Sequence, residues 1–341
     1  MTHELSLETR PVTIVAGRSA SGKRWLYAIL TAYALLALAY NLVVPIAEGP
    51  DEVEHIRYVE YIVRYGQLPP IGTGSSQRPY TVEAKQPATY YVIQAAIMCA
   101  LGRGGKQLVS EMQTDRSYPT TGIRYLHPPV VADLLPWTYI MRFFGMLCGL
   151  GTIALLYAAA REVFPDEKRA PLALGMASMG LLPQFTFMTS VVNNDHLAIL
   201  VGAWVSYLLA RILMRGVAWR TSILLGVALG CAIMTKTNLL VYVPVAMLVL
   251  ALAGMPWAAK QGHVRELAMF ARGRVPVMLA VLAVTFVVGG WWIGRNYLLY
   301  GDALGSSAVN EMAQQVFPRF IFTFNAADPA VFFERMVYTV D

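Results

Sequence analysis

Acidic residues and a histidine follow the first long apolar run of the sequence. Asp51 and Glu52 come directly after Gly49-Pro50, a pattern typical of a helix start, and apolar residues then recur at helical spacing until the next glycine. This predicts an amphipathic helix lying on the membrane surface. Asp51 and His55 are four residues apart and therefore share one face of this helix. An ordinary charged loop helix would have the same pattern. A metal site formed by Glu48, Asp51, Glu52 and His55 is a further alternative, although their spacing matches no ligand motif.

Two lysines stand where a negatively charged ligand could meet them. Lys85 comes shortly before the aromatic pair Tyr90 and Tyr91, and Lys236 stands alone between two apolar runs. An isolated cation at a membrane boundary needs a counter-charge, which a lipid phosphate could supply. Alternatively, both lysines reach to the membrane interface as anchors, with the tyrosines in its aromatic belt.

Two further polar groups interrupt the apolar runs. The first is a short link between two apolar segments, made of Asn193, Asn194, Asp195 and His196. Ordinary turns use the same residue types. The second group follows the last apolar run and contains Arg295, Asn296 and Asp302. The Trp291-Trp292 pair before it is interpreted as an interfacial anchor.

The composition indicates a multi-pass membrane protein. Of 341 residues, 56% are apolar and only 14% are charged, with a mean hydropathy of +0.49. A soluble chain carries about 25% charged residues. The net charge of +6 does not indicate nucleic-acid binding, because most basic residues fall in short stretches between apolar runs. The three cysteines lie inside apolar stretches, which supports neither a disulfide framework nor a zinc site.

Seven apolar runs are predicted to cross the membrane, with the N-terminus inside and the first run an uncleaved signal anchor. They are Trp25–Ile46, Phe143–Ala160, Pro171–Asn194, Leu197–Ala210, Thr221–Thr235, Thr237–Ala259 and Val275–Gly294. The shorter run Ala88–Gly102 is expected to lie in the outer interface. The predicted organisation is a cytoplasmic segment over 1–24, a transmembrane domain over 25–294 with an external loop over 47–142, and an external segment over 295–341. In this topology every candidate residue named above lies on the outer side.

Five motifs, taken in order, resemble those of the GT-C class of polyprenyl-phosphate-sugar-dependent glycosyltransferases. They read GPDE-x-x-H, Q-P-x-x-Y-Y, L-P-Q-F…N-N-D, T-K-T-N and G-W-W…R-N-x-x-x-Y-G-D-x-L. The branch that the chain is similar to is family-39-like, and includes relatives of the protein O-mannosyltransferases and of the lipid A aminoarabinose transferase. The resemblance covers roughly residues 25 to 310. Such enzymes usually have eleven or more spans, so the chain is expected to be truncated at its C-terminal end.

The resemblance implies a fold and a set of roles. The expected fold is an all-α polytopic membrane protein, a GT-C-like helical bundle whose long first external loop carries juxtamembrane helices. Asp51, with Glu52, would be the catalytic base of an inverting transfer, and Asp195 a supporting carboxylate. The cations expected at the donor phosphate are Lys85, Lys236, Arg142 and Arg295. The residues expected to contact the substrates are His55, Tyr90, Tyr91, Asn193, Asn194, His196, Asn296 and Asp302.

The partners implied are a polyprenyl-phosphate sugar donor, the lipid bilayer and an acceptor glycan, lipid or protein, with no nucleic acid. No cofactor is required by the residues, and a divalent metal stays open. The expected location is the bacterial inner membrane, with the active site on its outer face. The alternative function is a transporter or flippase of a lipid-linked sugar, which also carries charged residues within its spans.

Overall fold

The computed structural model describes residues 19–46, 49–72, 82–102, 114–115, 124–125, 131–164, 166–254 and 264–316. Within these ranges the chain is helical, apart from one antiparallel pair of two-residue strands, β1 (Thr114–Asp115) and β2 (Arg124–Tyr125). The predicted fold class, a helical membrane protein, is confirmed. The predicted terminal segments before residue 19 and after residue 316, and Glu48, lie outside the described residues.

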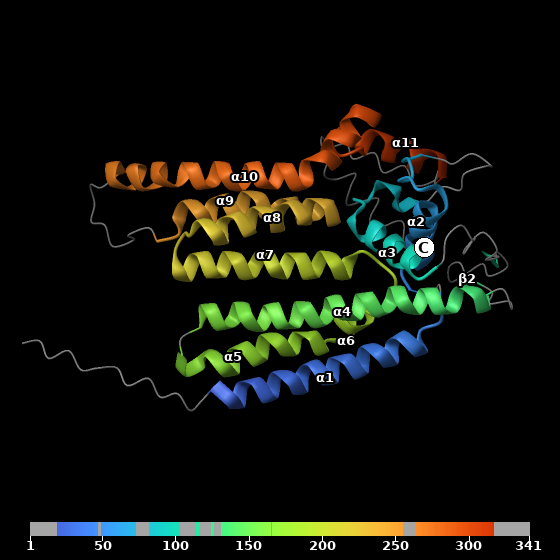
Figure 1. Ribbon diagram of the computed structural model, residues 1–341, viewed down its shortest axis with the longest axis horizontal. Coiled ribbons are helices and arrows are strands. Elements are labelled where there is room, and N and C mark those ends of the chain that lie inside the picture. Colours follow the sequence, from blue (N-terminus) through green and yellow to red (C-terminus); the bar gives the residue numbers. More distant parts are fainter. Residues whose placement is uncertain are drawn as a thin grey trace, which may run out of the picture.

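In the part of the chain that the structure describes, four helices are long and apolar enough to cross a membrane, judged by length and composition. They are α1 (Ser19–Val43), α4 (Val131–Val163), α7 (Asp195–Arg215) and α10 (Val264–Tyr300). Shorter helices fill the remaining predicted runs: α5 (Asp166–Ser178), η2 (Met179–Leu181), α6 (Pro183–Met188), α8 (Trp219–Thr235), η3 (Thr237–Val241) and α9 (Tyr242–Leu252). Figure 1 shows the axes of α1, α4, α5, α7, α8, α9 and α10 side by side and roughly aligned, and the chain reverses direction from each of these helices to the next along the sequence. The count of seven spans stays a prediction.

Two predicted spans differ from the helices that the structure contains. The run Pro171–Asn194 is not one helix, because the chain passes through an extended residue, Leu182, before α6 begins at Pro183. A proline lacks the N–H that would continue a helix, and it drives the preceding residue out of the helical region. In addition, α4 begins at Val131, twelve residues before the predicted span, so the predicted external loop ends as a helix.

Helices α1 and α4 approach closely where a tyrosine meets a glycine. A Cβ atom added at Gly149 would lie 1.8 Å from the Tyr33 hydroxyl oxygen. That hydroxyl donates a 2.8 Å hydrogen bond to Thr189 Oγ1, so it cannot move away without loss of the bond. Small residues commonly permit such contacts between membrane helices.

Gly149→Ala is therefore expected to lower the free energy of unfolding by about 1–3 kcal/mol, the usual cost of overpacking. Thermal unfolding in detergent measures the effect. The matched control is Gly175→Ala in α5, where an added Cβ meets nothing within 4 Å. This control should leave stability unchanged or raise it, because alanine favours a helix. Equal melting temperatures for the Gly149 variant and wild type would contradict the close packing.

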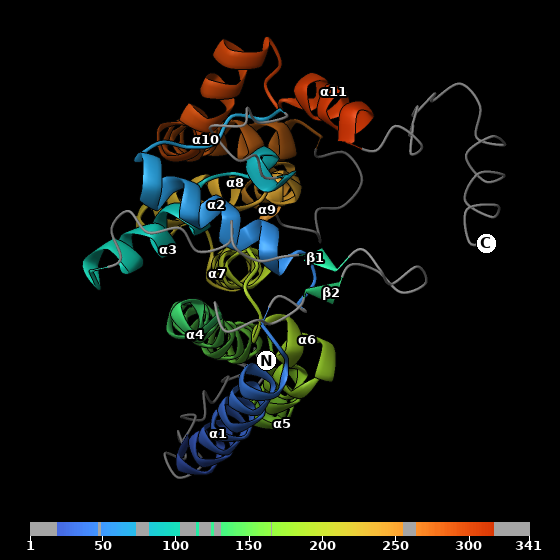
Figure 2. The same cartoon turned by 90° about the vertical axis from the view of Figure 1, so that its right-hand side faces the viewer.

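Four short helical elements cover one end of the bundle (Figures 1 and 2). They are α2 (Glu52–Tyr65), η1 (Val82–Lys85), α3 (Thr89–Ala100) and α11 (Ser306–Val316). Helix α2 has the predicted start after Asp51 and ends at Gly66, whose φ of 62° favours glycine. The structure thus has the juxtamembrane helices that the fold prediction placed after the first span.

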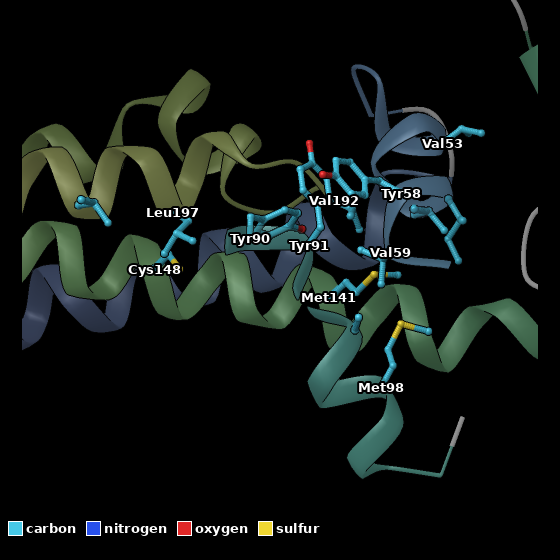
Figure 3. Close-up of a cluster of buried hydrophobic side chains, with 14 of the residues drawn as sticks. Val53, Tyr58, Val59, Tyr90, Tyr91, Met98, Met141, Cys148, Val192 and Leu197 are labelled. Atoms are coloured by element: carbon cyan, nitrogen blue, oxygen red, sulfur yellow. The ribbon is translucent and has the colours of Figure 1, made fainter. Parts of the chain in front are cut away.

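A buried apolar cluster fixes α2 and α3 to the ends of the long helices (Figure 3). Its members include Tyr58, Val59, Tyr90, Tyr91, Met98, Met141, Cys148, Val192 and Leu197. They come from α2, α3, α4, the link before α7, and α7 itself. Because these side chains are buried from water, the cluster holds the start of α2 in a defined place beside the start of α7.

Candidate active site

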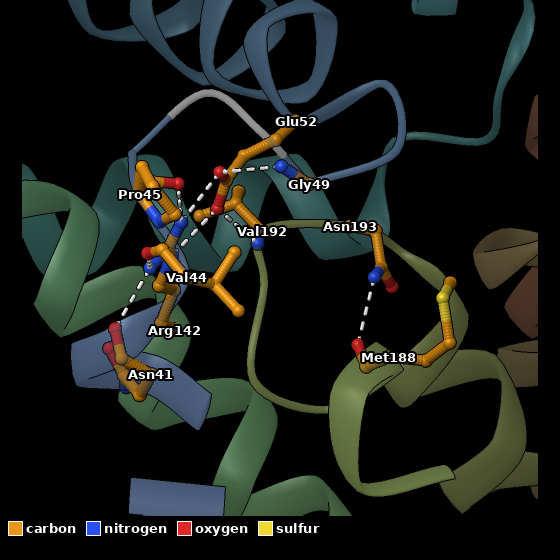
Figure 4. Close-up of polar contacts among 9 residues, drawn as sticks. All are labelled: Asn41, Val44, Pro45, Gly49, Glu52, Arg142, Met188, Val192 and Asn193. Carbon is orange, nitrogen blue, oxygen red and sulfur yellow. Dashed lines mark hydrogen bonds and ion pairs between the residues drawn. The ribbon is translucent and has the colours of Figure 1, made fainter. Parts of the chain in front are cut away.

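A buried ion pair joins Glu52 to Arg142 (Figure 4). Arg142 Nε donates to Glu52 Oε1 and Arg142 Nη2 donates to Glu52 Oε2, each at 2.7 Å. Both side chains are 0% exposed. This is the bidentate geometry in which a guanidinium and a carboxylate interact most strongly.

The rest of the Arg142 guanidinium is bound to main-chain oxygens. Nη1 donates to the carbonyls of Asn41 and Val44 at 2.9 and 2.8 Å, and Nη2 donates to the carbonyl of Pro45 at 3.0 Å. An arginine has five N–H donors, and all five are used here. The predicted role of Arg142 as a ligand of the donor phosphate does not fit this geometry, because no N–H is left for a phosphate.

Glu52 is also engaged in a way that does not fit the predicted catalytic role. Its Oε1 accepts a hydrogen bond from the Val192 N–H at 2.8 Å, and its Oε2 accepts one from the Gly49 N–H at 3.4 Å. The carboxylate is fully buried and neutralised by Arg142. A base must reach the proton that it removes, and this one faces only the protein.

Asp51, the preceding residue, is exposed. It stands at the N-cap of α2 with φ 53° and ψ 14°, and its side chain makes no capping hydrogen bond. The left-handed conformation is uncommon for a residue other than glycine. The carboxylate of Asp51 is thus presented outward at the end of the bundle, next to the buried Glu52.

Asp195 and Lys236 form an ion pair. Asp195 begins α7, and Lys236 follows the last residue of α8. Their side chains are 35% and 21% exposed, respectively, so both can reach a ligand. The expectation that Lys236 is an isolated cation is wrong, because Asp195 supplies its counter-charge.

Asn193 holds Asp195 in place. Its side-chain Oδ1 accepts a 2.8 Å hydrogen bond from the Asp195 N–H, and its Nδ2 donates to the Met188 carbonyl at 2.9 Å (Figure 4). Asn193 and Asn194 are both buried. Asn193 thus supports the turn that carries Asp195, whereas Asn194 precedes α7 without a side-chain capping hydrogen bond, and the predicted contact of both with substrate stays a prediction.

Glu83 belongs to the same region, and sequence reasoning missed it. It is buried, and its Oε1 lies 4.0 Å from Lys85 Nζ, whose side chain is 39% exposed. Burial raises the pKa of Glu83, Lys85 and Lys236 act to lower it, and Asp51 acts to raise it. Three predicted site residues, Asp51, Lys85 and Lys236, therefore act electrostatically on the Glu83 carboxylate. An acid two residues before a predicted phosphate-binding lysine was the signal that could have indicated Glu83.

Buried aromatic rings and histidines from α2, α3 and α7 pack against one another at this end of the bundle. His55 Nδ1 lies 2.9 Å from the Tyr91 hydroxyl oxygen, and the Tyr91 ring stacks on Tyr58 with centroids 3.7 Å apart. The Tyr90 ring meets the His196 ring edge-on at 5.0 Å. His55, Tyr90, Tyr91 and His196 are all buried. The predicted direct substrate contacts of these four residues do not fit their burial: His55 instead contacts Tyr91, and the Tyr90 ring packs against His196.

Burial lowers the pKa of His55 to about 3 from its ordinary 6.5, with smaller contributions from His196, Lys236 and Lys85. Between these values the unfolded chain binds a proton that the folded chain does not. The stability contribution of a neutral His55 is therefore complete above pH 6.5 and is lost as the pH falls, by about 1.4 kcal/mol per pH unit.

His55→Gln is expected to reduce this loss, because glutamine does not titrate and still has a partner in the Tyr91 hydroxyl. The comparison is the change in melting temperature between pH 7 and pH 5 for the variant and for wild type. An equal change in the two proteins would show that His55 does not become protonated on unfolding.

Arg295 and Asn296 lie in the last turns of α10, which continues to Tyr300, beyond the end of the predicted span at Gly294. Arg295 Nη1 donates to Asn296 Oδ1 at 3.3 Å, Arg295 Nη2 donates to the Pro69 carbonyl at 3.4 Å, and its guanidinium lies 5.1 Å from the Trp292 ring centroid. Trp292 and Asn296 are buried, so Trp292 is not the interfacial anchor that was expected. These bonds occupy only part of the guanidinium.

Asp302 is a helix cap. Its carboxylate accepts hydrogen bonds from the N–H groups of Leu304 and Ser307, at 2.9 and 3.1 Å, and these bonds lower its pKa. Both carboxylate oxygens thus bind backbone donors around the start of α11, and the predicted substrate contact of Asp302 stays a prediction.

A metal site is not formed by the part of the chain that the structure describes: no three His, Cys, Asp or Glu side chains there come close enough to hold an ion. Of the four residues considered in the sequence, Glu52 is bound to Arg142 and His55 to Tyr91. Phosphate binding at this end of the bundle can be achieved by the lysines alone.

Comparisons with known proteins bear on the resemblance. Residues 138–286, from α4 into α10, match the model of the family described as dolichyl-phosphate-mannose-protein mannosyltransferase. A search of curated proteins finds no match. A solved structure that is similar is the archaeal oligosaccharyltransferase AglB from Archaeoglobus fulgidus, in complex with an inhibitory peptide and a dolichol-phosphate. It is 14% identical with a TM-score of 0.46, and the alignment covers 95% of this chain and 40% of that one. The matched residues 138–286 confirm the resemblance to GT-C class glycosyltransferases that the motifs predicted.

Proposed function

We propose that this protein is a membrane glycosyltransferase that moves a sugar from a polyprenyl-phosphate donor to an acceptor hydroxyl. The observation that carries the proposal is the group of charges at one end of an apolar bundle: Asp51, the Glu83–Lys85 pair and the Asp195–Lys236 pair. A carboxylate can accept the proton of the acceptor hydroxyl or stabilise positive charge on the sugar, and a lysine can bind a phosphate. The family match over α4 to α10 supports a donor of this chemical class.

The transfer inverts the anomeric carbon, with Asp51 as the base. Asp51 takes the proton of the acceptor hydroxyl while the acceptor oxygen bonds to the anomeric carbon. The bond from that carbon to the phosphate oxygen breaks, and the electron pair leaves with polyprenyl phosphate. Positive charge develops on the sugar in an oxocarbenium-like transition state, which Asp195 stabilises.

The leaving phosphate gains negative charge, which Lys85 and Lys236 stabilise, with Arg295 as a third cation. Lys236 is paired with Asp195, so the phosphate shares or replaces that contact. The prenyl tail of the donor stays in the lipid beside the helices, and its sugar reaches the charged end of the bundle. We place this end on the outer face of a bacterial inner membrane, with the N-terminus in the cytoplasm.

A donor panel tests the proposal. The full-length protein in detergent is given radiolabelled polyprenyl-phosphate sugars and an acceptor fraction from membranes, and release of polyprenyl phosphate is followed. The expected result is release with one donor class and a product of inverted anomeric configuration. A product with the configuration of the donor would contradict Asp51 as the base. Absence of release with every donor would contradict the transferase.

A further inference from the structure

The Glu52–Arg142 pair connects four segments that are far apart in the sequence. Arg142 belongs to α4 and binds carbonyls in the last turn of α1 and just after it. Glu52 begins α2 and accepts a hydrogen bond from the N–H of Val192 in the link before α7. Figure 4 shows these segments meeting around the pair. One buried carboxylate therefore sets where α2 and the link before α7 begin, each relative to α1 and α4.

Both ends of this connection lie next to the charged groups. Glu52 directly follows Asp51 in the chain, and Val192 lies three residues before Asp195. The turn that carries Asp51 also packs on the link, since a Cβ added at Gly49 would lie 2.8 Å from Val191 Cβ. A shift of Glu52 would thus displace Asp51 and Asp195 relative to each other.

The backbone conformation of Asp51 depends on contacts that its neighbours in the chain make. A φ of 53° is uncommon for a residue other than glycine, although aspartate adopts it more readily than most, and the contacts around Asp51 help to select it. The neighbouring contacts on either side are the bonds of the Glu52 carboxylate to the Gly49 N–H and to Arg142. These contacts fix the backbone on both sides of Asp51 and so hold its exposed carboxylate in place.

We propose that Glu52 and Arg142 are a positioning pair, which holds Asp51 at a working distance from Asp195 and Lys236 without touching either substrate. This inference rests on the proposed function, and it assigns to both residues a role other than base or phosphate ligand. Misplacement of a catalytic group by about 1 Å can cost about 10²-fold in rate.

The test compares Glu52→Gln with wild type in the donor assay. Glutamine retains an acceptor for the Val192 N–H but loses the charge that holds Arg142. The expected result is a fall in kcat of about 10- to 100-fold with the KM for the donor and the Kd for polyprenyl phosphate within about threefold of wild type. The control is Glu54→Gln, which breaks the Glu54–Arg57 pair on the same helix and should leave kcat unchanged.

Glu52→Gln alone could prevent folding, so a second variant, Glu52→Gln with Arg142→Met, removes both buried charges. Leaving one buried charge unpaired is strongly destabilising, whereas replacing both partners is often tolerated. The double variant should melt closer to wild type and still have a low kcat. Wild-type kcat in the single or the double variant would overturn the proposal. So would a tenfold rise in the Kd for polyprenyl phosphate at unchanged kcat, which would make Arg142 a phosphate ligand.

A readout that needs no activity separates this inference from the proposed function. Hydrogen exchange of the peptide that contains Val192 to Asp195 should become at least tenfold faster in Glu52→Gln, because the Val192 N–H loses its charged acceptor. If wild type releases no polyprenyl phosphate from any donor, the proposed function fails. The exchange rate then still tests whether Glu52 and Arg142 hold the link before α7 in place. Unchanged exchange would overturn the positioning role.

Discussion

Asp51→Asn is expected to lower kcat for sugar transfer by about 10²- to 10⁴-fold, the usual contribution of a general base. Asparagine has nearly the same shape, and like aspartate it tolerates a left-handed backbone, so α2 should begin as before. What the variant loses is the group that accepts the proton of the acceptor hydroxyl. The KM for the donor should change little, because Asp51 carries no bond to the phosphate.

The measurement is a single-turnover rate of sugar transfer with the donor found in the panel. Melting temperature and the Kd for polyprenyl phosphate serve as controls for folding and for the donor site. Asp51→Glu is a further control that retains a base in a shifted position and should keep part of the rate. A wild-type rate in Asp51→Asn would remove Asp51 from the mechanism and with it the proposed inversion by this base.

Lys236→Met is expected to lower kcat by about 10²- to 10³-fold, the effect seen when one donor to a developing anion is removed. The lysine pairs with Asp195, and a methionine of similar length leaves that carboxylate without a counter-charge. Binding of polyprenyl phosphate should weaken as well, because a phosphate oxygen loses a cation and faces an unpaired Asp195.

Calorimetric titration with polyprenyl phosphate and the transfer rate together measure this effect. Lys236→Met with Asp195→Asn should recover part of the affinity, since the repulsive carboxylate is gone, but not the rate. The control is Arg215→Gln, which breaks an exposed pair with Glu162 between α7 and α4. An unchanged affinity in Lys236→Met would show that the phosphate binds elsewhere.

Local signals in the sequence were sufficient for the elements that carry the site. The start of α2 at Glu52 follows from a proline and two acids at its first turn, and the end at Gly66 from a left-handed glycine. The break before α6 follows from Pro183, although composition alone predicted one continuous span. Apolar length located the long helices, because each must have enough apolar residues to cross lipid.

Partnerships between distant residues were not predictable. Arg142 and Glu52 are 90 positions apart, and nothing near either residue indicates that the other takes up its charge. Lys236 and Asp195 are 41 positions apart, so the lysine looked isolated in the sequence although it is paired in the fold. Burial of His55 and Glu83 likewise depends on how α2 and η1 pack against other elements. A charged residue can be located from the sequence, but whether it forms an ion pair with another residue depends on tertiary contacts.

Reconstituted liposomes give the most direct test of the central claim. Wild type and Asp51→Asn are placed in vesicles that contain a radiolabelled polyprenyl-phosphate sugar and an acceptor, and two quantities are followed in the same sample. These are the release of polyprenyl phosphate and the movement of intact donor between leaflets. We predict release by wild type and its loss in Asp51→Asn. Movement of intact donor across the bilayer without release by either protein would contradict a transferase and indicate a transporter of lipid-linked sugar.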